Sequence, residues 1–278
     1  MKIVLHNKYG QLGNRVILIT HFIKYALDHQ HKLYISNFEE YKTLFNESSL
    51  KSLEKSGIRF TKLSPIHKFY RALGYRFGPM LSRFITIWDI RQKFDMQEKT
   101  CVLEENFPTT NYVFPDGWLF RSEKLNAHDR PWVQQLFRPN AAIEEKISAF
   151  LKQLDSQKET IGLHIRRGDY KDFLGGKYYF EFDYYLKLIE RIQEEFPHTN
   201  MIICSDEKLP EEFNKFESVF ISNSDFVTDL FLLSKCAYIV GVPSTFSLIA
   251  GYLGHSKLLR VKGELEIKRS DFLNINCI

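Results

Sequence analysis

The second half of the chain alternates between short apolar runs and amphipathic stretches, and this alternation limits the folds open to it. The apolar runs have the length of buried strands, and the stretches between them carry apolar residues at helical spacing. The expected strands are 161–165, 200–204, 219–221, 237–240 and 257–261, and the expected helices are 183–196, 227–235 and 244–253. Strands that alternate with helices form βαβ units with a parallel sheet, so we predict a doubly wound α/β unit.

The first half starts with the same pattern. Residues 2–5 are a short apolar run, a turn rich in Gly and Asn follows over 7–14, and 16–29 carries one apolar face. A second strand at 31–36 completes a βαβ unit. Gly and Pro interrupt the region 44–95, where we predict only short helices, and 140–154 is expected to form a further helix.

The length of 278 residues fits one large domain or two modest ones. A polar break at 155–159 separates the two α/β patterns. We therefore predict an N-terminal domain over 1–155 and a C-terminal domain over 156–278, facing each other across a cleft. With 44% hydrophobic and 26% charged residues, the composition is that of a globular protein and not of a disordered one.

Charge and cysteine content exclude several classes of protein. A net charge of +4 is too small for a strongly basic nucleic-acid binder. The four cysteines fit neither a zinc site nor a disulfide framework, so we expect buried thiols in a reducing compartment. The N-terminus lacks the pattern of a signal peptide and no run of eighteen apolar residues occurs, so the expected location is cytoplasmic.

A charged motif directly follows the first strand of the second half: His164-Ile165-Arg166-Arg167-Gly168-Asp169-Tyr170. Open α/β sheets bind ligands at the carboxyl ends of their strands, and the planar guanidinium of arginine fits phosphate oxygens. The alternative is an internal ion pair between an arginine and Asp169. We expect Asp169 to hold one arginine and to leave the other for an anionic ligand.

Polar residues also follow two other predicted strands. Ser244, Thr245 and Phe246 open a helix after strand 237–240, where free backbone N–H groups and hydroxyls can hold a phosphate, or merely cap the helix. Asp206 and Glu207 follow strand 200–204. A carboxylate there can accept hydrogen bonds from a base such as guanine, or cap the next segment.

The sequence has no D-x-D pair, the usual carboxylate pair for a metal ion bound to a nucleotide sugar. A complete G-x-G-x-x-G after the first strand and a P-loop lysine motif are also missing. We expect no metal and no cofactor, because Arg166 and Arg167 can neutralise a leaving diphosphate instead.

In this order, the motifs resemble those of the α1,2-fucosyltransferase family, which is related to α1,6- and protein O-fucosyltransferases. The matching pieces are the turn Gly10-Gln11-Leu12-Gly13-Asn14, residues 117–124, the motif 164–170, the pair 205–206, residues 229–236 and Ser244-Thr245-Phe246-Ser247. Three positions depart from the family pattern. Arg15 replaces a Gln, Leu248-Ile249 replace a pair of Trp, and Glu207 replaces an Asp.

The resemblance implies a glycosyltransferase fold of the B type, with two Rossmann-like domains, and an inverting, metal-independent transfer. The donor would be GDP-fucose and the acceptor a glycan hydroxyl, with an α1,2 linkage to a galactoside favoured. The site residues implied are His164 with Asp206 or Glu207 for guanine, Arg166 beside Ser244, Thr245 and Phe246 for the diphosphate, and Gly13 and Asn14 near the fucose or acceptor. The departures leave the acceptor open.

The general base has two candidates. His6 ends the first strand, and Asp172 lies just past the arginine motif. Two other functions stay open: a transferase that uses another nucleotide sugar, and a non-catalytic protein that binds a sugar nucleotide.

Residues 51–93 contain ten Lys or Arg and only two acidic residues. Aromatic residues are interleaved with them: Phe69, Tyr70, Tyr75, Phe77, Phe84 and Trp88. No RNA- or DNA-binding motif accompanies the charge. Such a surface would suit an anionic membrane and a lipid-linked acceptor. The alternative is an ordinary helical surface whose rings lie in the core.

Overall fold

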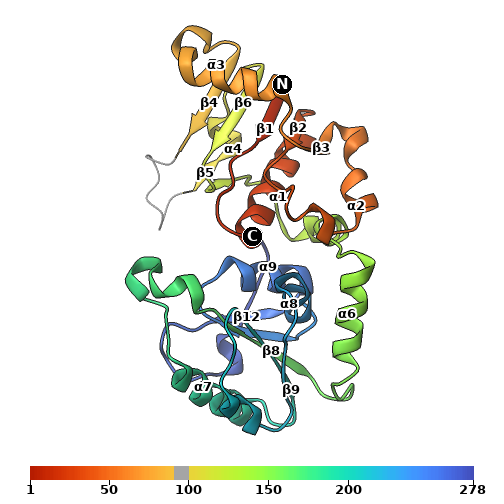
Figure 1. Ribbon diagram of the computed structural model, residues 1–278, viewed down its shortest axis with the longest axis vertical. Coiled ribbons are helices and arrows are strands. Elements are labelled where there is room, and N and C mark those ends of the chain that lie inside the picture. Colours follow the sequence, from red (N-terminus) through yellow and green to blue (C-terminus); the bar gives the residue numbers. More distant parts are fainter. Residues whose placement is uncertain (91–99) are drawn as a thin grey trace. The chain divides into compact units, whose positions relative to one another are not determined.

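The computed structural model describes residues 1–90 and 100–278. Arg91 and Lys93 of the basic stretch lie outside the described residues. The chain forms two compact units, Met1–Asn140 and Ala141–Ile278 (Figure 1). Each unit has its own sheet of mainly parallel strands, which confirms the predicted α/β fold class.

The two units divide at Asn140, before the predicted boundary at Asp155. Helix α6 (Ala141–Leu151) packs against helix α8 (Phe226–Leu233) of the second unit and so belongs to that unit. An ion pair of 2.7 Å between Lys146 Nζ on α6 and Asp225 Oδ2, at the start of α8, joins the two helices. The sequence shows the polar break after α6 but not the packing that assigns this helix.

The first unit contains a parallel five-stranded sheet in the order β3-β2-β1-β6-β4 and a small sheet of β5 and β7. The strands are β1 (Lys2–Leu5), β2 (Lys32–Ile35), β3 (Ile58–Phe60), β4 (Ile85–Asp89), β5 (Cys101–Val102), β6 (Tyr112–Asp116) and β7 (Phe120–Arg121). The helices are α1 (Leu12–Asp28), α2 (Glu47–Lys51), α3 (Pro65–Leu81), α4 (Leu103–Asn106) and α5 (Arg130–Leu136). The chain adds β2 and β3 on one side of β1, then β4 and β6 on the other, so the strand order reverses at β1.

Helix α1 begins at Leu12, earlier than the predicted start at position 16. Gly13 and Asn14 therefore lie in the first helical turn and not in the turn before it. Gly10, with φ of +60°, makes the preceding turn. Arg15, one of the departures from the family pattern, is buried and donates to Asn37 O at 2.9 Å, so it ties α1 to the loop after β2.

The middle of the first unit contains one of the predicted short helices, α2, and otherwise differs from the prediction. It contains strands β3 and β4 and one long helix, α3, with two glycines inside. A Cβ on Gly74 would lie 2.9 Å from Ile85 Cγ2, so the glycine lets α3 approach strand β4 closely. The helix is kinked at Phe77, two residues before Pro79, as a proline inside a helix causes.

The second unit contains a six-stranded sheet in the order β10-β9-β8-β11-β12-β13, in which only β13 is antiparallel. The strands are β8 (Thr160–Ile165), β9 (Asn200–Ser205), β10 (Val219–Ile221), β11 (Tyr238–Gly241), β12 (Lys257–Arg260) and β13 (Leu273–Asn274). The helices are α6 (Ala141–Leu151), α7 (Phe182–Glu195), α8 (Phe226–Leu233) and α9 (Thr245–Gly254). The five predicted strands and three predicted helices are confirmed, and β13 was not predicted.

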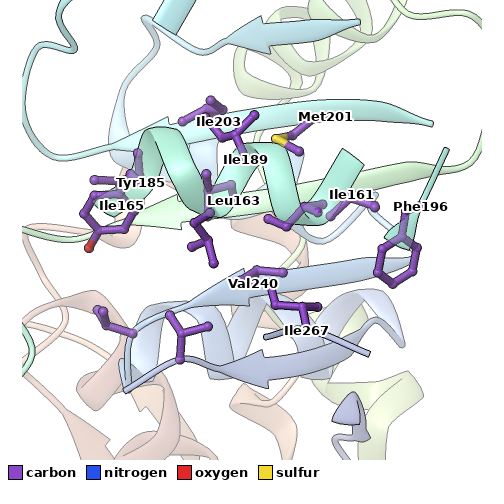
Figure 2. Packing of buried hydrophobic residues seen from close by; sticks show 14 of the residues in the cluster. Ile161, Leu163, Ile165, Tyr185, Ile189, Phe196, Met201, Ile203, Val240 and Ile267 are labelled. Carbon is purple, nitrogen blue, oxygen red and sulfur yellow. The ribbon is translucent and has the colours of Figure 1, made fainter. Parts of the chain in front are cut away.

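The central strand β8 is buried on both faces. Ile161, Leu163 and Ile165 belong to a core that α7 covers, and Figure 2 shows them beneath that helix. The alternate residues face the other way: a Cβ on Gly162 would lie 2.6 Å from Leu233 of α8. His164 shares this second face, so its side chain is directed toward the α8 and α9 side of the sheet.

All four cysteines are free thiols. Cys101, Cys204 and Cys236 are buried as predicted, whereas Cys277 is exposed near the C-terminus, so the prediction is wrong for that residue. Within residues 1–90 and 100–278, no helix combines the length and apolar character needed to cross a bilayer.

Candidate functional site

Three polar segments of the second unit meet at one edge of its sheet. Strands β9, β8 and β11 are parallel neighbours, with Ile165 opposite Ser205 and Gly241 opposite His164. The chain adds β9 and β10 on one side of β8, and then β11 and β12 on the other. The carboxyl ends of β8 and β11 therefore form a topological switch point, where open α/β sheets bind ligands.

Arg166 follows β8 at this edge. Its Nη1 lies 3.0 Å from Asp206 Oδ2 and its Nη2 lies 2.7 Å from Asp169 Oδ1. The side chain of Asp169 is 57% exposed, against 17% for Arg166 and 19% for Asp206. An exposed ion pair contributes little free energy, so the Asp169 partner is the replaceable one. Asp169 holds one arginine, as the sequence predicted, but the other, Arg167, is not left for a ligand, because Glu181 and Glu207 bind it.

Arg167 points into the second unit and is 6% exposed. Its Nε donates to Glu207 Oε2 at 2.9 Å. Its Nη1 donates to Glu181 Oε2 at 3.1 Å and to the carbonyl of Phe180, and its Nη2 donates to the hydroxyl of Tyr179. The guanidinium also lies 4.0 Å from the ring centroid of Phe182. These contacts give Arg167 a structural role, and a contact with the donor stays a prediction.

Asp206 fixes the shape of the arginine loop. In addition to Arg166, its carboxylate accepts the backbone N–H of Arg167 at 2.9 Å. A Cβ on Gly168 would lie 3.0 Å from Asp206 Oδ2, so the loop passes close to this carboxylate. Asp206 and Glu207, one of which was predicted to contact guanine, thus each already hold an arginine.

His164 is buried and neutral. Its Nδ1 lies 3.3 Å from Ser247 Oγ, and its ring stacks on Phe246 with centroids 4.9 Å apart. Burial, and next the charge of Arg166, lower the pKa of His164 to about 3. A Cβ on Gly241 would lie 3.0 Å from the carbonyl oxygen of His164, so only glycine fits on the neighbouring strand without a shift.

The start of α9 completes the edge. Ser244 is the N-cap, and its Oγ accepts the backbone N–H of Phe246 at 3.2 Å, which is the capping alternative raised by the sequence. Ser244, Thr245 and Phe246 are partly exposed. The hydroxyl of Tyr170 donates to Pro243 O at 2.6 Å, so the loops after β8 and β11 are joined.

Several residues that shape this site were not predicted. Tyr170 and Ser247 stand in the quoted motifs but gave no reason to expect a role. Tyr179 and Glu181 gave no signal at all, because they reach Arg167 only after the loop folds back. That fold uses backbone with positive φ at Leu174, together with the two glycines that follow it.

The predicted residues of the first unit lie at the carboxyl end of β1. Burial, and next the charge of Arg71, lower the pKa of His6 to about 4, and neither ring nitrogen meets a partner in good geometry within the described chain. Gly13 is buried, and Asn14 packs against Gly10 with its Oδ1 buried. In the second unit, Asp172 is exposed between two turns of 3₁₀ helix.

A buried carboxylate that the sequence did not reveal lies at the switch point of the first sheet. Asp116 ends β6, next to β1, and is 1% exposed. It accepts from Asn7 Nδ2 at 2.6 Å, from the hydroxyl of Tyr75 at 2.9 Å and from the hydroxyl of Tyr9. This carboxylate organises the loop after β1.

The family model of "Glycosyl transferase family 11" matches residues 118–272, which is more than half of the chain and includes the ends of β8, β9 and β11 that form the site. The chain belongs to glycosyl transferase family 11. It is therefore a glycosyltransferase, as predicted. No curated protein matches its sequence.

Solved structures share the fold of this family 11 chain. A mutant of Arabidopsis thaliana FUT1 in complex with GDP is similar over 98% of this chain and 73% of that chain, at 13% identity and a TM-score of 0.66. NodZ alpha-1,6-fucosyltransferase co-crystallised with GDP is similar over 93% of this chain and 94% of that chain, at 14% identity and a TM-score of 0.57. POFUT1 in complex with GDP-fucose is similar over 92% of this chain and 95% of that chain, at 15% identity and a TM-score of 0.55. The expected glycosyltransferase fold of the B type is confirmed.

Proposed function

We propose that this chain transfers fucose from GDP-fucose to a hydroxyl of a glycan. The observation that carries the proposal is Arg166 at the switch point of the second sheet, fixed by Asp206 and also paired with the exposed Asp169. Membership of family 11, and the fucosyltransferases with GDP or GDP-fucose that share the fold, support the same donor.

The diphosphate of the donor replaces Asp169 on Arg166. A β-phosphate offers the same oxygen acceptors as the carboxylate and carries more charge, so the exchange keeps the guanidinium paired. Asp206 stays in place and aims the guanidinium. Ser244, Thr245 and Phe246, at the N-terminus of the ten-residue helix α9, contribute backbone N–H groups and the positive end of the helix dipole.

Charge then develops on the leaving GDP as the glycosidic bond breaks. Arg166 stabilises this charge, so the reaction needs no divalent metal; the missing D-x-D pair supports this proposal. The acceptor hydroxyl attacks from the face opposite GDP, and the transfer inverts the configuration of the anomeric carbon. Binding and orientation of the two sugars supply most of the remaining acceleration.

Guanine binds beside His164, with Asp206 or Glu207 accepting from its N–H groups. A neutral His164 ring suits this role, because it adds no charge beside Arg166. Glu207 is the better carboxylate acceptor of the two, since Asp206 already accepts from two groups of the arginine loop.

The acceptor is a galactoside-type glycan linked α1,2, free or lipid-linked, and it approaches Gly13 and Asn14. His6 is the favoured base, because its unprotonated ring can take the hydroxyl proton. Its low pKa makes it a weak base, so positioning contributes more than proton abstraction. Asp172 is the second candidate. We propose a cytoplasmic location, as the sequence suggested.

Donor titration and product analysis test this function together. GDP and GDP-fucose should bind in calorimetry with EDTA present, whereas UDP- and ADP-sugars should not. Galactosides should then yield an α1,2-fucosylated product by NMR. Binding of another nucleotide sugar in preference to GDP-fucose would refute the donor. Binding of GDP-fucose without transfer to any glycan would favour the non-catalytic alternative.

A further inference from the structure

Helix α3 and the turn after it expose several large apolar side chains. Residues 66–84 supply six of the eleven large hydrophobic side chains that are exposed in the described part of the chain. They are Ile66, Phe69, Tyr75, Phe77, Met80 and Phe84, with exposed fractions from 40% to 83%. Phe84 follows α3, and the hydroxyl of Tyr75 donates to the buried Asp116, so we call the other four, Ile66, Phe69, Phe77 and Met80, the α3 surface. Single exposed apolar residues are ordinary, but a group on one element marks an interaction site.

The core of the first unit does not explain this surface. Tyr70, Leu73 and Leu81 already pack α3 against the cluster of Val4, Ile85 and Phe114. Ile66, Phe69, Phe77 and Met80 are left exposed beside these core residues. A helix on a globular unit normally needs only the face directed to the core.

The charge around the α3 surface has a single sign. Residues 61–88 contain five Lys or Arg and no acidic residue. Lys62, Lys68, Arg76 and Arg83 are exposed, and none forms an ion pair with a described residue. The guanidinium of Arg76 lies 5.4 Å from the ring centroid of Phe77, so a cation stands directly beside the apolar row.

We propose that the α3 surface docks on an anionic lipid bilayer. Apolar side chains enter the boundary between headgroups and acyl chains, and the flanking cations contact lipid phosphates, as on interfacial amphipathic helices. Residues 61–88 carry basic and no acidic side chains, so their charge is complementary to a uniformly negative surface. A protein partner would need an equally one-signed acidic face. The docking does not depend on the proposed donor.

Vesicle sedimentation of the full chain tests the proposal. The chain should bind vesicles of phosphatidylcholine with phosphatidylglycerol at low salt, and should bind pure phosphatidylcholine at least tenfold more weakly. The variant Phe69→Ser with Met80→Ser should weaken binding by roughly tenfold or more, because two apolar side chains no longer enter the bilayer. The variant Lys68→Gln with Arg76→Gln should weaken it by roughly thirtyfold, at about 1 kcal/mol for each cation.

Matched controls lie in the second unit. Leu273→Ser removes a side chain that is 68% exposed, and Lys262→Gln removes an exposed cation, so neither should change vesicle binding. Circular dichroism melts confirm that each variant is folded. Arg166→Ala should bind vesicles like the wild type, so the failure of the donor proposal and of this one are distinguishable.

Three results would overturn the proposal: no binding to anionic vesicles at low salt, equal losses in the controls, or binding that ignores both salt and lipid charge. Analytical ultracentrifugation covers the main competitor. A dimer of the wild type that dissociates in the Phe69→Ser, Met80→Ser variant would show that a second copy of the chain covers this surface instead.

Discussion

The two neighbouring arginines should respond to alanine in opposite ways. Arg167→Ala removes a buried guanidinium that donates to Glu207, Glu181, Tyr179 and the carbonyl of Phe180. Loss of one partner from a buried charged network costs roughly 3–5 kcal/mol, since the remaining groups stay desolvated and unpaired. For a chain of this size the melting temperature should fall by about 10 °C.

Arg166→Ala should leave the fold intact. Asp169 returns to water, and Asp206 keeps the backbone N–H of Arg167, so the loss of stability should not exceed about 1 kcal/mol. Transfer should fall by roughly 10²–10³ in kcat, because no other described cation pairs with Asp206 to take up the charge of the leaving diphosphate.

Thermal melts, GDP calorimetry and single-turnover transfer on both variants separate these effects. Arg166→Lys is the matched control: it keeps the charge but loses the planar fork, so its transfer rate should lie between wild type and alanine. A wild-type melting temperature for Arg167→Ala would refute its structural role. Wild-type turnover by Arg166→Ala would refute the proposed mechanism.

Three further predictions follow from other parts of the structure. Burial raises the pKa of Asp229 to about 7, so the folded state holds a proton that the unfolded state loses, and this group destabilises the fold as pH rises from about 4 to 7. In urea unfolding, the free energy of unfolding of Asp229→Asn relative to wild type should therefore rise by about 2–4 kcal/mol between pH 5 and 8. A difference in free energy of unfolding that stays constant with pH would contradict this. A Cβ on Gly254 would lie 2.0 Å from Ser234 O, so Gly254→Ala should lower the free energy of unfolding by about 3 kcal/mol or prevent folding. The control is Gly78→Ala, whose Cβ would meet no atom within 4 Å and which should leave the melting temperature unchanged. EDTA should leave the initial transfer rate unchanged, and a loss restored by Mg²⁺ or Mn²⁺ would overturn metal independence.

The second unit was predictable because its central strands are buried on both faces. Such strands appear as continuous apolar runs bounded by polar residues, and β8 and β9 are of this kind. The charged residues that follow these runs fall at the carboxyl edge by geometry alone. The sequence therefore located the arginine motif and the carboxylates on the correct edge of the sheet.

The first unit was harder to predict from the sequence, because its strands are short and one of its glycines lies inside a helix instead of ending it. Strand β3 has only three residues, and Gly74 looks like a helix breaker although it serves close packing of α3 on β4. Asp116 sits at the end of a run that also contains a proline, so nothing marked it as the acceptor of three side chains. Contacts made through tertiary packing leave no local pattern.

The separate roles of the arginines were hidden for the same reason. Both residues stand in one motif, and the sequence cannot tell which one turns inward. Tyr179 and Glu181 decide it, and they approach only because Leu174, Gly175 and Gly176 reverse the chain with positive φ.

The described strands of the first sheet all precede Asn140, and those of the second all follow Ala141. A cut at this joint would sever one peptide bond and no strand pairing. The half that carries the arginine motif is thus one uninterrupted length of chain, which recombination could graft whole onto a different N-terminal partner. If the proposed roles of the two units hold, acceptor preference would then change in a single genetic event while the proposed nucleotide-binding unit passes on unaltered.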